Sequence, residues 1–231
     1  RKGVAAMDLA EIEARIIAQI GEKGPQLGKE LSFAMPDVPV LALWQACFRS
    51  KAFLVSHFAS YYLRYDITRE DQVRLSPSIL RDFLSFTLFG LAGQQDLMIE
   101  RQGSLSNTHR EISREKIALA QSAMKSVLLK LGRDIRGQIC AFIAGDLAYY
   151  LAHNEPREHA ASGEMVRGSD VDIVVIMQDG LPEETKLQFE AELSALKSFY
   201  LRHPDYRHEI DFICKRQSVM ERQFGYGDIH D

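Results

Sequence analysis

The sequence predicts an α+β protein in which an α-helical first half is followed by a small mixed sheet. Two observations support this fold class. Through most of residues 1–132 the apolar residues recur at helical spacing, whereas from Ile139 onward short β-branched runs alternate with helical stretches. These later elements follow the order strand, helix, strand, helix, strand. We therefore expect a helical region over residues 1–132, packing on or beside an α/β region over residues 133–231.

The first region is expected to consist of helices. Asp8 with Glu11 is typical of a capping pair, and the isoleucines that follow form one apolar stripe. Further helices are predicted over about residues 40–65, from Ser76-Pro77 through the apolar run that ends near residue 89, and over residues 108–132. The polar residues 102–107 indicate an exposed loop before the last of these helices.

The second region is predicted to contain three strands, over residues 138–144, 171–177 and 208–214. The middle strand is rich in β-branched residues and is expected to be buried on both faces. A short helix over residues 147–153 and a longer one over residues 181–203 connect the strands. The polar residues 154–168, which include His159, Ser162 and Gly163, predict a flap-like loop.

The composition is that of an ordinary globular protein, with 46% hydrophobic and 26% charged residues. The formal charge of −4 gives no electrostatic footprint for nucleic acid. Cys140 and Cys214 each lie within an apolar run and are expected to be buried free thiols, which favours a reducing, cytoplasmic setting. No apolar run is long enough for a membrane span and no signal peptide is evident, so we expect no membrane partners.

Two carboxylates, Asp170 and Asp172, lie at the start of the most apolar predicted strand. Residues two apart in a strand point to the same side, so both side chains project together. Like charges side by side on a core strand are unfavourable unless a cation neutralises them, and Mg²⁺ binds through carboxylates and phosphate oxygens. The pair therefore predicts a metal site. The alternative is structural, with Asp170 in a turn and Asp172 on an exposed edge strand.

A third acid, Asp211, lies between apolar residues of the last predicted strand. If the second and third strands pair, Asp211 lies opposite Asp170 or Asp172 at the same end of the sheet. Three carboxylates from two strands are typical of sites in which two cations bridge a triphosphate and an attacking hydroxyl. Asp170, Asp172 and Asp211 are thus the predicted metal-binding and catalytic residues.

This arrangement, with Gly145 opening the short helix, Asp170 and Asp172 on the next strand and Asp211 on the last, resembles the nucleotidyltransferase superfamily typified by DNA polymerase β. The resemblance covers about residues 133–216. It implies an Mg²⁺- or Mn²⁺-dependent transfer of a nucleoside monophosphate from a nucleoside triphosphate, expected to be ATP, to a hydroxyl with release of pyrophosphate. The acceptor is left open among a small molecule, a protein side chain and an RNA end.

The resemblance also implies a nucleotide-binding set around the acids, namely Gly145, Asp146, Arg167, Gly168 and Ser169. The family has Gly-Ser where this chain has Gly145-Asp146, so a carboxylate replaces a hydroxyl that contacts phosphate. We interpret Asp146 as a further metal ligand or a helix cap. Because an anion at this helix end opposes phosphate, a second hypothesis is a non-catalytic module of the same fold that binds a nucleotide or a protein. A third hypothesis places the function in the helical first region as an interaction surface.

Overall fold

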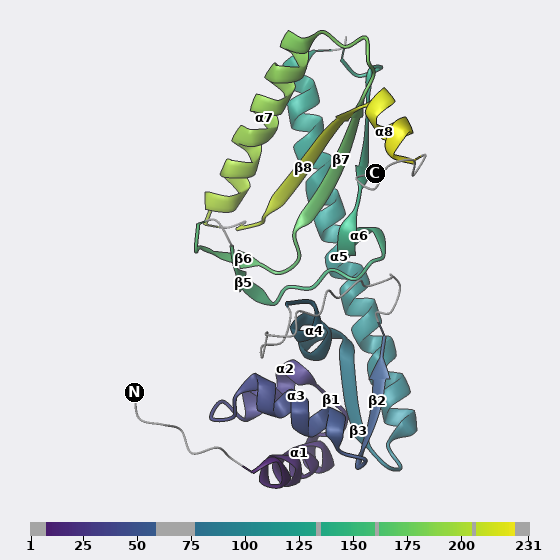
Figure 1. Ribbon diagram of the computed structural model, residues 1–231, viewed down its shortest axis with the longest axis vertical. Coiled ribbons are helices and arrows are strands. Elements are labelled where there is room, and N and C mark those ends of the chain that lie inside the picture. Colours follow the sequence, from purple (N-terminus) through teal and green to yellow (C-terminus); the bar gives the residue numbers. More distant parts are fainter. Residues whose placement is uncertain (1–7, 59–76, 133–134, 160–161, 205–206, 225–231) are drawn as a thin grey trace. The chain divides into compact units, whose positions relative to one another are not determined.

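Figure 1 shows the computed structural model, which describes residues 8–58, 77–132, 135–159, 162–204 and 207–224. The protein is α+β, with helices and small sheets, as predicted. The chain divides into two compact units, Arg1–Asn107 and Thr108–Asp231. This division falls within helix α5 (Gln95–Leu131), whereas the sequence-based boundary follows residue 132. Among the residues described, every helix is too short or too polar to cross a lipid bilayer.

The N-terminal unit combines short helices with a three-stranded antiparallel sheet of order β1-β3-β2. The Asp8 side chain accepts a hydrogen bond from the Ala10 N–H, and Ile12, Ile16 and Ile20 are buried, which confirms the predicted cap and stripe. The elements are, in order, α1 (Leu9–Lys23), β1 (Gln26–Leu27), α2 (Gly28–Ala34), α3 (Val40–Arg49), β2 (Phe53–His57), α4 (Pro77–Arg81), a π-helical segment (Asp82–Phe86), β3 (Thr87–Leu91) and the first part of α5.

The prediction of an all-helical first half is wrong at β2 and β3, which were both expected inside helices. β3 is the central strand, and its first four residues are buried, so it shows no alternation of polar and apolar side chains. A short apolar run of this kind suits a buried helix and a buried strand equally well. The loop expected at residues 102–107 is also wrong, because these residues continue α5. Residues 59–65 of the helix predicted over residues 40–65 lie outside the described residues.

The C-terminal unit is built on a three-stranded sheet of order β4-β7-β8 (Figure 1). β4 is antiparallel to β7, and β8 is parallel to it. The elements after α5 are β4 (Ile139–Ile143), α6 (Gly145–Ala148), β5 (Pro156–Glu158), β6 (Met165–Arg167), β7 (Val171–Met177), α7 (Glu183–Arg202), β8 (Ile210–Arg216) and α8 (Gln217–Phe224). All three predicted strands are present. The short helix lies earlier than predicted, and the expected flap contains the β5–β6 hairpin.

One face of this sheet carries the core, and the other is open. Alternate residues of β7, beginning with Val171, are buried against α5 and α7. The intervening residues, Asp172, Val174 and Ile176, are only partly buried, so the strand is not buried on both faces as expected. On the same side as Val174, its partner Phe142 on β4 is exposed. We refer to this side of the β4-β7-β8 sheet as the open face.

The exposure of the cysteine side chains in this sheet depends on the face and the strand on which they lie. Cys140 pairs with Ile176 on the open face of β4, which is an edge strand, and it is exposed, so the expectation of a buried thiol there is wrong. Cys214 is partly buried and Cys47 is fully buried. Burial raises the pKa of Cys47 to about 12 and that of Cys214 to about 11.

Candidate metal centre

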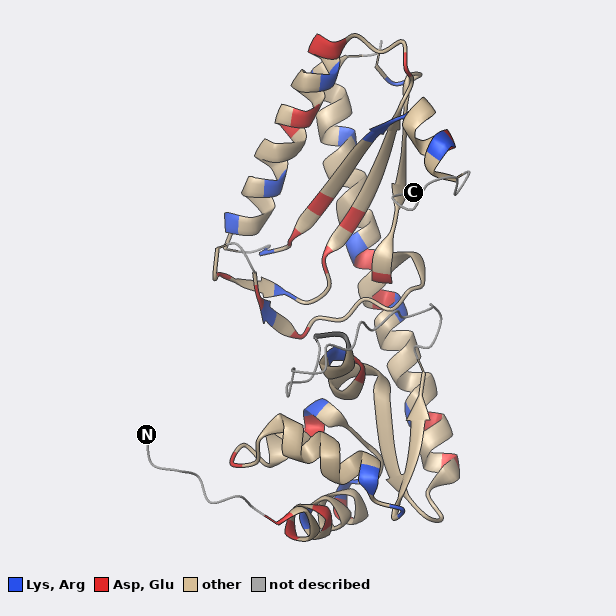
Figure 2. Cartoon of the chain, in the orientation of Figure 1, with Lys and Arg blue, Asp and Glu red and all other residues tan. Residues whose placement is uncertain are grey.

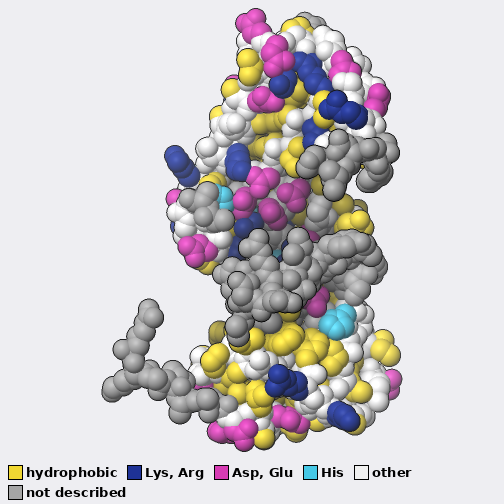
Figure 3. Space-filling view, in the orientation of Figure 1, with side chains coloured by type: hydrophobic (Ala, Val, Ile, Leu, Met, Phe, Trp, Pro, Cys, Tyr) yellow, Lys and Arg dark blue, Asp and Glu magenta, His cyan; other side chains and the backbone are white. Residues whose placement is uncertain are grey.

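The three predicted acids converge at one end of the open face, where acidic side chains gather in Figure 3. Asp172 of β7 and Asp211 of β8 are direct partners in the parallel register, so their side chains share this face. Asp170 lies immediately before β7. One carboxylate oxygen from each of the three residues lies within 4.8 Å of the others. The structure therefore brings together all three acids named from the sequence, which we call the acidic triad.

Asp172 occupies the most strained electrostatic position of the acidic triad. Burial raises its pKa to about 6, and the negative charges of Asp170 and Asp211, then Asp146 and Glu209, add to the effect. No described basic side chain forms an ion pair with it. The site therefore concentrates more negative charge around Asp172 than the protein itself neutralises.

The two outer carboxylates each have a basic partner from a neighbouring element. Lys197 of α7 forms an ion pair with Asp211. Arg157 of the β5–β6 hairpin lies 3.6 Å from Asp170 and 2.6 Å from Glu209. Figure 2 shows acidic positions side by side on β7 and β8, with basic positions on the surrounding elements. The charge of the outer carboxylates is thus partly compensated, whereas that of Asp172 is not.

Gly145, the first residue of α6, lies next to the side chain of Asp172. Its φ is +63°, a left-handed conformation that favours glycine. A Cβ built on Gly145 would lie 2.3 Å from Asp172 Oδ2, so a larger residue would displace that carboxylate. The preceding Ala144 N–H donates to the Asp172 carbonyl oxygen at 2.9 Å, which ties the end of β4 to β7. Gly145 therefore shapes the triad by leaving room for it.

Asp146 and Ser169 engage one another in the interior. The Ser169 hydroxyl donates to Asp146 Oδ2 at 3.3 Å and accepts the His153 N–H at 3.1 Å. Both residues are buried. The N-cap residue of α6 is Ala144, one position before Gly145, and the Asp146 carboxylate is not a member of the triad. These two predicted nucleotide-binding residues are thus buried and engaged in internal hydrogen bonds.

The remaining predicted residues lie in the turn that leads into β7. Arg167 is exposed at the end of β6. Gly168 is buried with a φ of +62°, and a Cβ there would lie 1.9 Å from the His153 carbonyl oxygen. The Ser169 N–H donates to that same oxygen at 3.0 Å. Only a glycine fits at position 168, because the backbone there passes so close to that of His153 and Asn154. This contact fixes the turn and therefore the direction of Asp170.

The sequence analysis did not identify Lys116, whose side chain forms hydrogen bonds to the backbone of the turn between β6 and β7. The lysine lies on α5, is 3% exposed, and its ammonium donates to the carbonyl oxygens of Arg167 and Ser169 at 2.9 and 2.8 Å. It also lies 3.2 Å from His208 Nδ1. Burial lowers the pKa of Lys116 to about 8. Burial, together with the charge of Lys116, lowers the pKa of His208 to about 4, so the neutral ring accepts from the ammonium. The signal in the sequence is a lysine on the same helical stripe as Ala120 and Val127.

Replacing Lys116 by methionine should loosen the turn before Asp170. Two carbonyl oxygens would lose their donor, so we expect the free energy of unfolding to fall by about 1–3 kcal/mol, offset in part by relief of the buried charge. Manganese affinity should fall several-fold because Asp170 loses its fixed direction. Urea unfolding and Mn²⁺ titration measure both effects. Lys125→Met, at an exposed position of the same helix, is the control; equal effects of the two substitutions would contradict this role.

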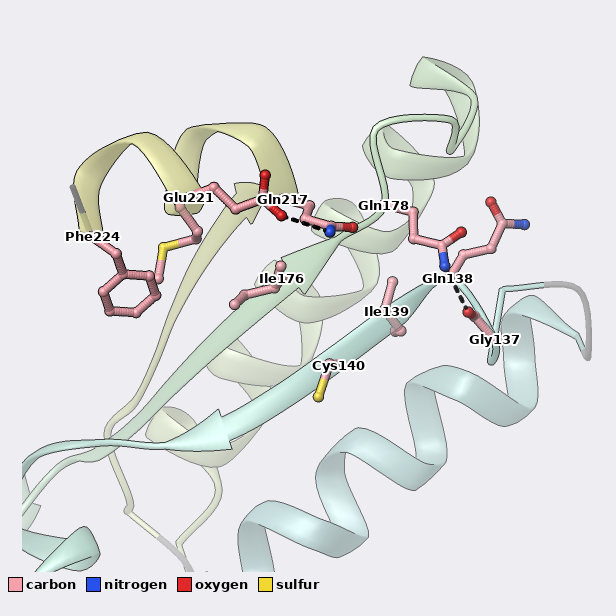
Figure 4. Close-up of a pocket in the computed structure, with 10 residues that line it drawn as sticks. Gly137, Gln138, Ile139, Cys140, Ile176, Gln178, Gln217, Glu221 and Phe224 are labelled. Atoms are coloured by element: carbon pink, nitrogen blue, oxygen red, sulfur yellow. Dashed lines mark hydrogen bonds between the residues drawn. The ribbon is translucent and has the colours of Figure 1, made fainter.

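A separate groove of about 380 Å³ lies at the other end of the sheet, beneath α8 (Figure 4). Cys140 and Ile176 form its floor, and Phe224 of α8 stands at its rim. Its one acidic side chain, Glu221, accepts a hydrogen bond from Gln217 at 2.8 Å. The groove offers apolar surface without a cluster of charged groups, so it has no part in the triad.

The donor set of the acidic triad fits a hard dication. Three carboxylate oxygens lie close enough to face one ion, and Mg²⁺ and Mn²⁺ prefer oxygen ligands. Burial and, after it, the neighbouring negative charges raise the pKa of Asp172, and a bound dication would oppose both effects. Comparisons of the chain with protein-family models, with curated proteins and with solved structures returned no significant match.

Proposed function

We propose that this protein is a metal-dependent nucleotidyltransferase that moves a nucleoside monophosphate from a nucleoside triphosphate to a hydroxyl acceptor and releases pyrophosphate. ATP is the expected donor. The observation that carries the proposal is the meeting of Asp170, Asp172 and Asp211 at one end of an open sheet face. Three carboxylates without enough basic partners are suited to dications, and dications are suited to the transfer of phosphoryl groups.

The order of elements supports the same proposal. A strand, a short helix opened by glycine, a strand with two acids, a helix and a strand with the third acid occur in β4, α6, β7, α7 and β8. The acids of β7 and β8 face one another because these strands are adjacent and parallel. We take this order, with the β5–β6 hairpin inserted between α6 and β7, as support for the resemblance to the nucleotidyltransferase superfamily.

Each carboxylate has a role in the proposed reaction. Asp170 and Asp172 would hold the metal ions, and Asp211 would complete the site and accept the proton of the acceptor hydroxyl at its carboxylate oxygen. Bound dications would neutralise the triphosphate and favour in-line displacement at the α-phosphorus. Gly145 keeps the Asp172 carboxylate in place, and Lys116 fixes the turn that directs Asp170. The chain thus supplies positioning and charge, with no need for a covalent nucleophile.

The test is release of pyrophosphate from radiolabelled nucleotides in the presence of Mg²⁺ or Mn²⁺. We expect the wild-type protein to release it, and Asp211→Asn to lower the rate by on the order of a hundredfold or more, because an acceptor base and a metal ligand are lost together. Glu164→Gln, which removes an exposed acid elsewhere in the unit, should leave the rate unchanged. Silence of the wild type with all four nucleotides, both metals and each acceptor class would reject catalysis.

One observation favours the non-catalytic alternative. Asp146 stands where the family has a serine, and the Ser169 hydroxyl is already engaged with it, so neither presents a free hydroxyl to phosphate. On this alternative the unit binds a nucleotide or a protein without turnover. Calorimetry separates the two: nucleotide binding that requires Mg²⁺ and disappears in Asp170→Asn supports the enzyme, and metal-independent binding supports the module.

A further inference from the structure

Lys197 is the basic residue that reaches the acidic triad from α7. Its ammonium forms an ion pair with Asp211 Oδ1, and the two side chains are 38% and 35% exposed. Among the described residues Asp211 is its only hydrogen-bonding or ion-pair partner. The contact therefore depends on one flexible, solvated side chain that can leave without disturbing other bonds.

Arg157, the other basic residue at the triad, is held differently. Its Nε donates to the Gly168 carbonyl oxygen at 2.9 Å, and its guanidinium donates to Glu209 at 2.6 Å. The nearest oxygen of Asp170 is farther away, at 3.6 Å. Arg157 is thus held by the Gly168 carbonyl oxygen and by Glu209, whereas Lys197 has a single partner that it can exchange.

We infer that Lys197 is an exchangeable counter-ion of the triad: it neutralises Asp211 in the metal-free protein, yields that carboxylate to a dication, and then binds a phosphate oxygen of the metal-bound triphosphate. This inference rests on the proposed function and names a residue for binding of the polyphosphate. It assigns to an ammonium group the phosphate contact that Asp146 and Ser169 do not offer.

Two physical arguments support the exchange. An ammonium and a dication compete for the same carboxylate oxygen, and the partly solvated ion pair is weak enough for the dication to displace it. After displacement the ammonium remains tethered close to the triad, on a stem of four methylene groups. A compact point charge of this kind binds phosphate oxygens well without demanding a fixed geometry. The same side chain therefore opposes binding of the metal alone and favours binding of the metal-bound polyphosphate.

The experiment measures these two opposite effects of Lys197, one on the affinity for the metal alone and one on the affinity for the metal-bound polyphosphate. Mn²⁺ alone is titrated into the full chain by electron paramagnetic resonance, and tripolyphosphate is titrated at saturating Mg²⁺ by calorimetry, so the base of the nucleotide plays no part. Lys197→Met removes the charge and keeps most of the length of the side chain. We expect it to bind Mn²⁺ about two- to fivefold more tightly than the wild type and tripolyphosphate about tenfold more weakly. Lys186→Met, on the same helix and paired with Glu183, should change neither.

The outcomes separate this inference from the proposed function. If the wild type binds Mn²⁺ but Lys197→Met changes neither affinity, or changes both in the same direction, the exchange is refuted and the metal site stands. If the wild type binds no Mn²⁺, the metal site and the exchange are both refuted. Lys197→Gln repeats the measurement with a polar side chain, and circular dichroism confirms that each variant is folded.

Discussion

Asp172→Asn is expected to stabilise the C-terminal unit at neutral pH while lowering the proposed nucleotidyl transfer by on the order of a thousandfold. The loss of activity follows because the central ligand of the acidic triad is removed, and metal ions contribute several kcal/mol to such reactions. The gain in stability follows because the native protein must keep a half-buried carboxylate charged, and among other negative charges. A substitution that improves folding and abolishes function is the signature of a strained active site.

The pH dependence tests the electrostatic cause. The pKa of Asp172 is about 6 in the folded protein, above its ordinary value of 3.8, so the folded state binds more protons between these values than the unfolded state does. Stability contributed by this residue is therefore lost as the pH rises through that window, and the full loss is present above pH 6. The shift sets a ceiling of about 3 kcal/mol, which partial solvation reduces to roughly 1–2 kcal/mol.

Denaturant unfolding in metal-free buffer measures this difference. The stability of Asp172→Asn should exceed that of the wild type by about 1–2 kcal/mol above pH 6, and the two should agree below about pH 4. Glu164→Gln, at an exposed acid of the same unit, should follow the wild type throughout. Added Mn²⁺ should stabilise the wild type and leave Asp172→Asn unchanged, because the proposed metal site requires the Asp172 carboxylate. A pH-independent difference would show that the triad is not the source of the strain.

Gly168→Ala is expected to destabilise the C-terminal unit by about 3–4 kcal/mol. The added Cβ would lie 1.9 Å from the His153 carbonyl oxygen and 2.7 Å from the Asn154 Cα, both of which are backbone atoms that cannot rotate away. The left-handed φ adds a cost of its own. The turn must shift to relieve this contact, and Asp170 shifts with it, so Mn²⁺ affinity should fall at least tenfold.

Gly163→Ala provides a control with matched backbone. Gly163 also has a left-handed φ, +69°, but its nearest neighbour to an added Cβ is Glu158 Oε1 at 3.5 Å, an ordinary contact. Its destabilisation should therefore be limited to the conformational cost of about 1–2 kcal/mol, with Mn²⁺ affinity unchanged. The difference between the two variants in urea unfolding isolates the steric contact at Gly168. Equal losses of stability would show that the backbone passage is not tight.

The site could be predicted from the sequence where its geometry is local or follows from strand pairing. Asp170 and Asp172 are two residues apart on a strand with a clear apolar pattern, and Asp211 needs only one further assumption, that β7 and β8 are neighbours. Lys116, Arg157 and Lys197 could not be found in this way, because each reaches its partner through tertiary packing. Lys116, for example, contacts carbonyl oxygens more than fifty residues ahead of it.

The secondary structure likewise divides into elements that a local sequence pattern predicts and elements that only tertiary pairing identifies. The α1 stripe of isoleucines has a helical period that no strand would share, and it was predicted correctly. After Thr87, the side chains of β3 show no alternation of polar and apolar residues, and only the pairing with β1 and β2 identifies the segment as a strand. The burial of Cys140 was mispredicted for a related reason: an apolar run does not reveal that its strand lies at an edge with one face open.

The open face has a practical consequence for spectroscopy. Cys140 is exposed on β4, whereas Cys47 is buried and Cys214 is partly buried, each with a raised pKa that suppresses its thiolate. A maleimide dye or nitroxide would therefore attach at Cys140 in the unmodified chain. The label would lie on the same side of the sheet as Asp172, so ion and polyphosphate titrations could be followed by fluorescence or by distance-dependent paramagnetic broadening without introducing a new cysteine.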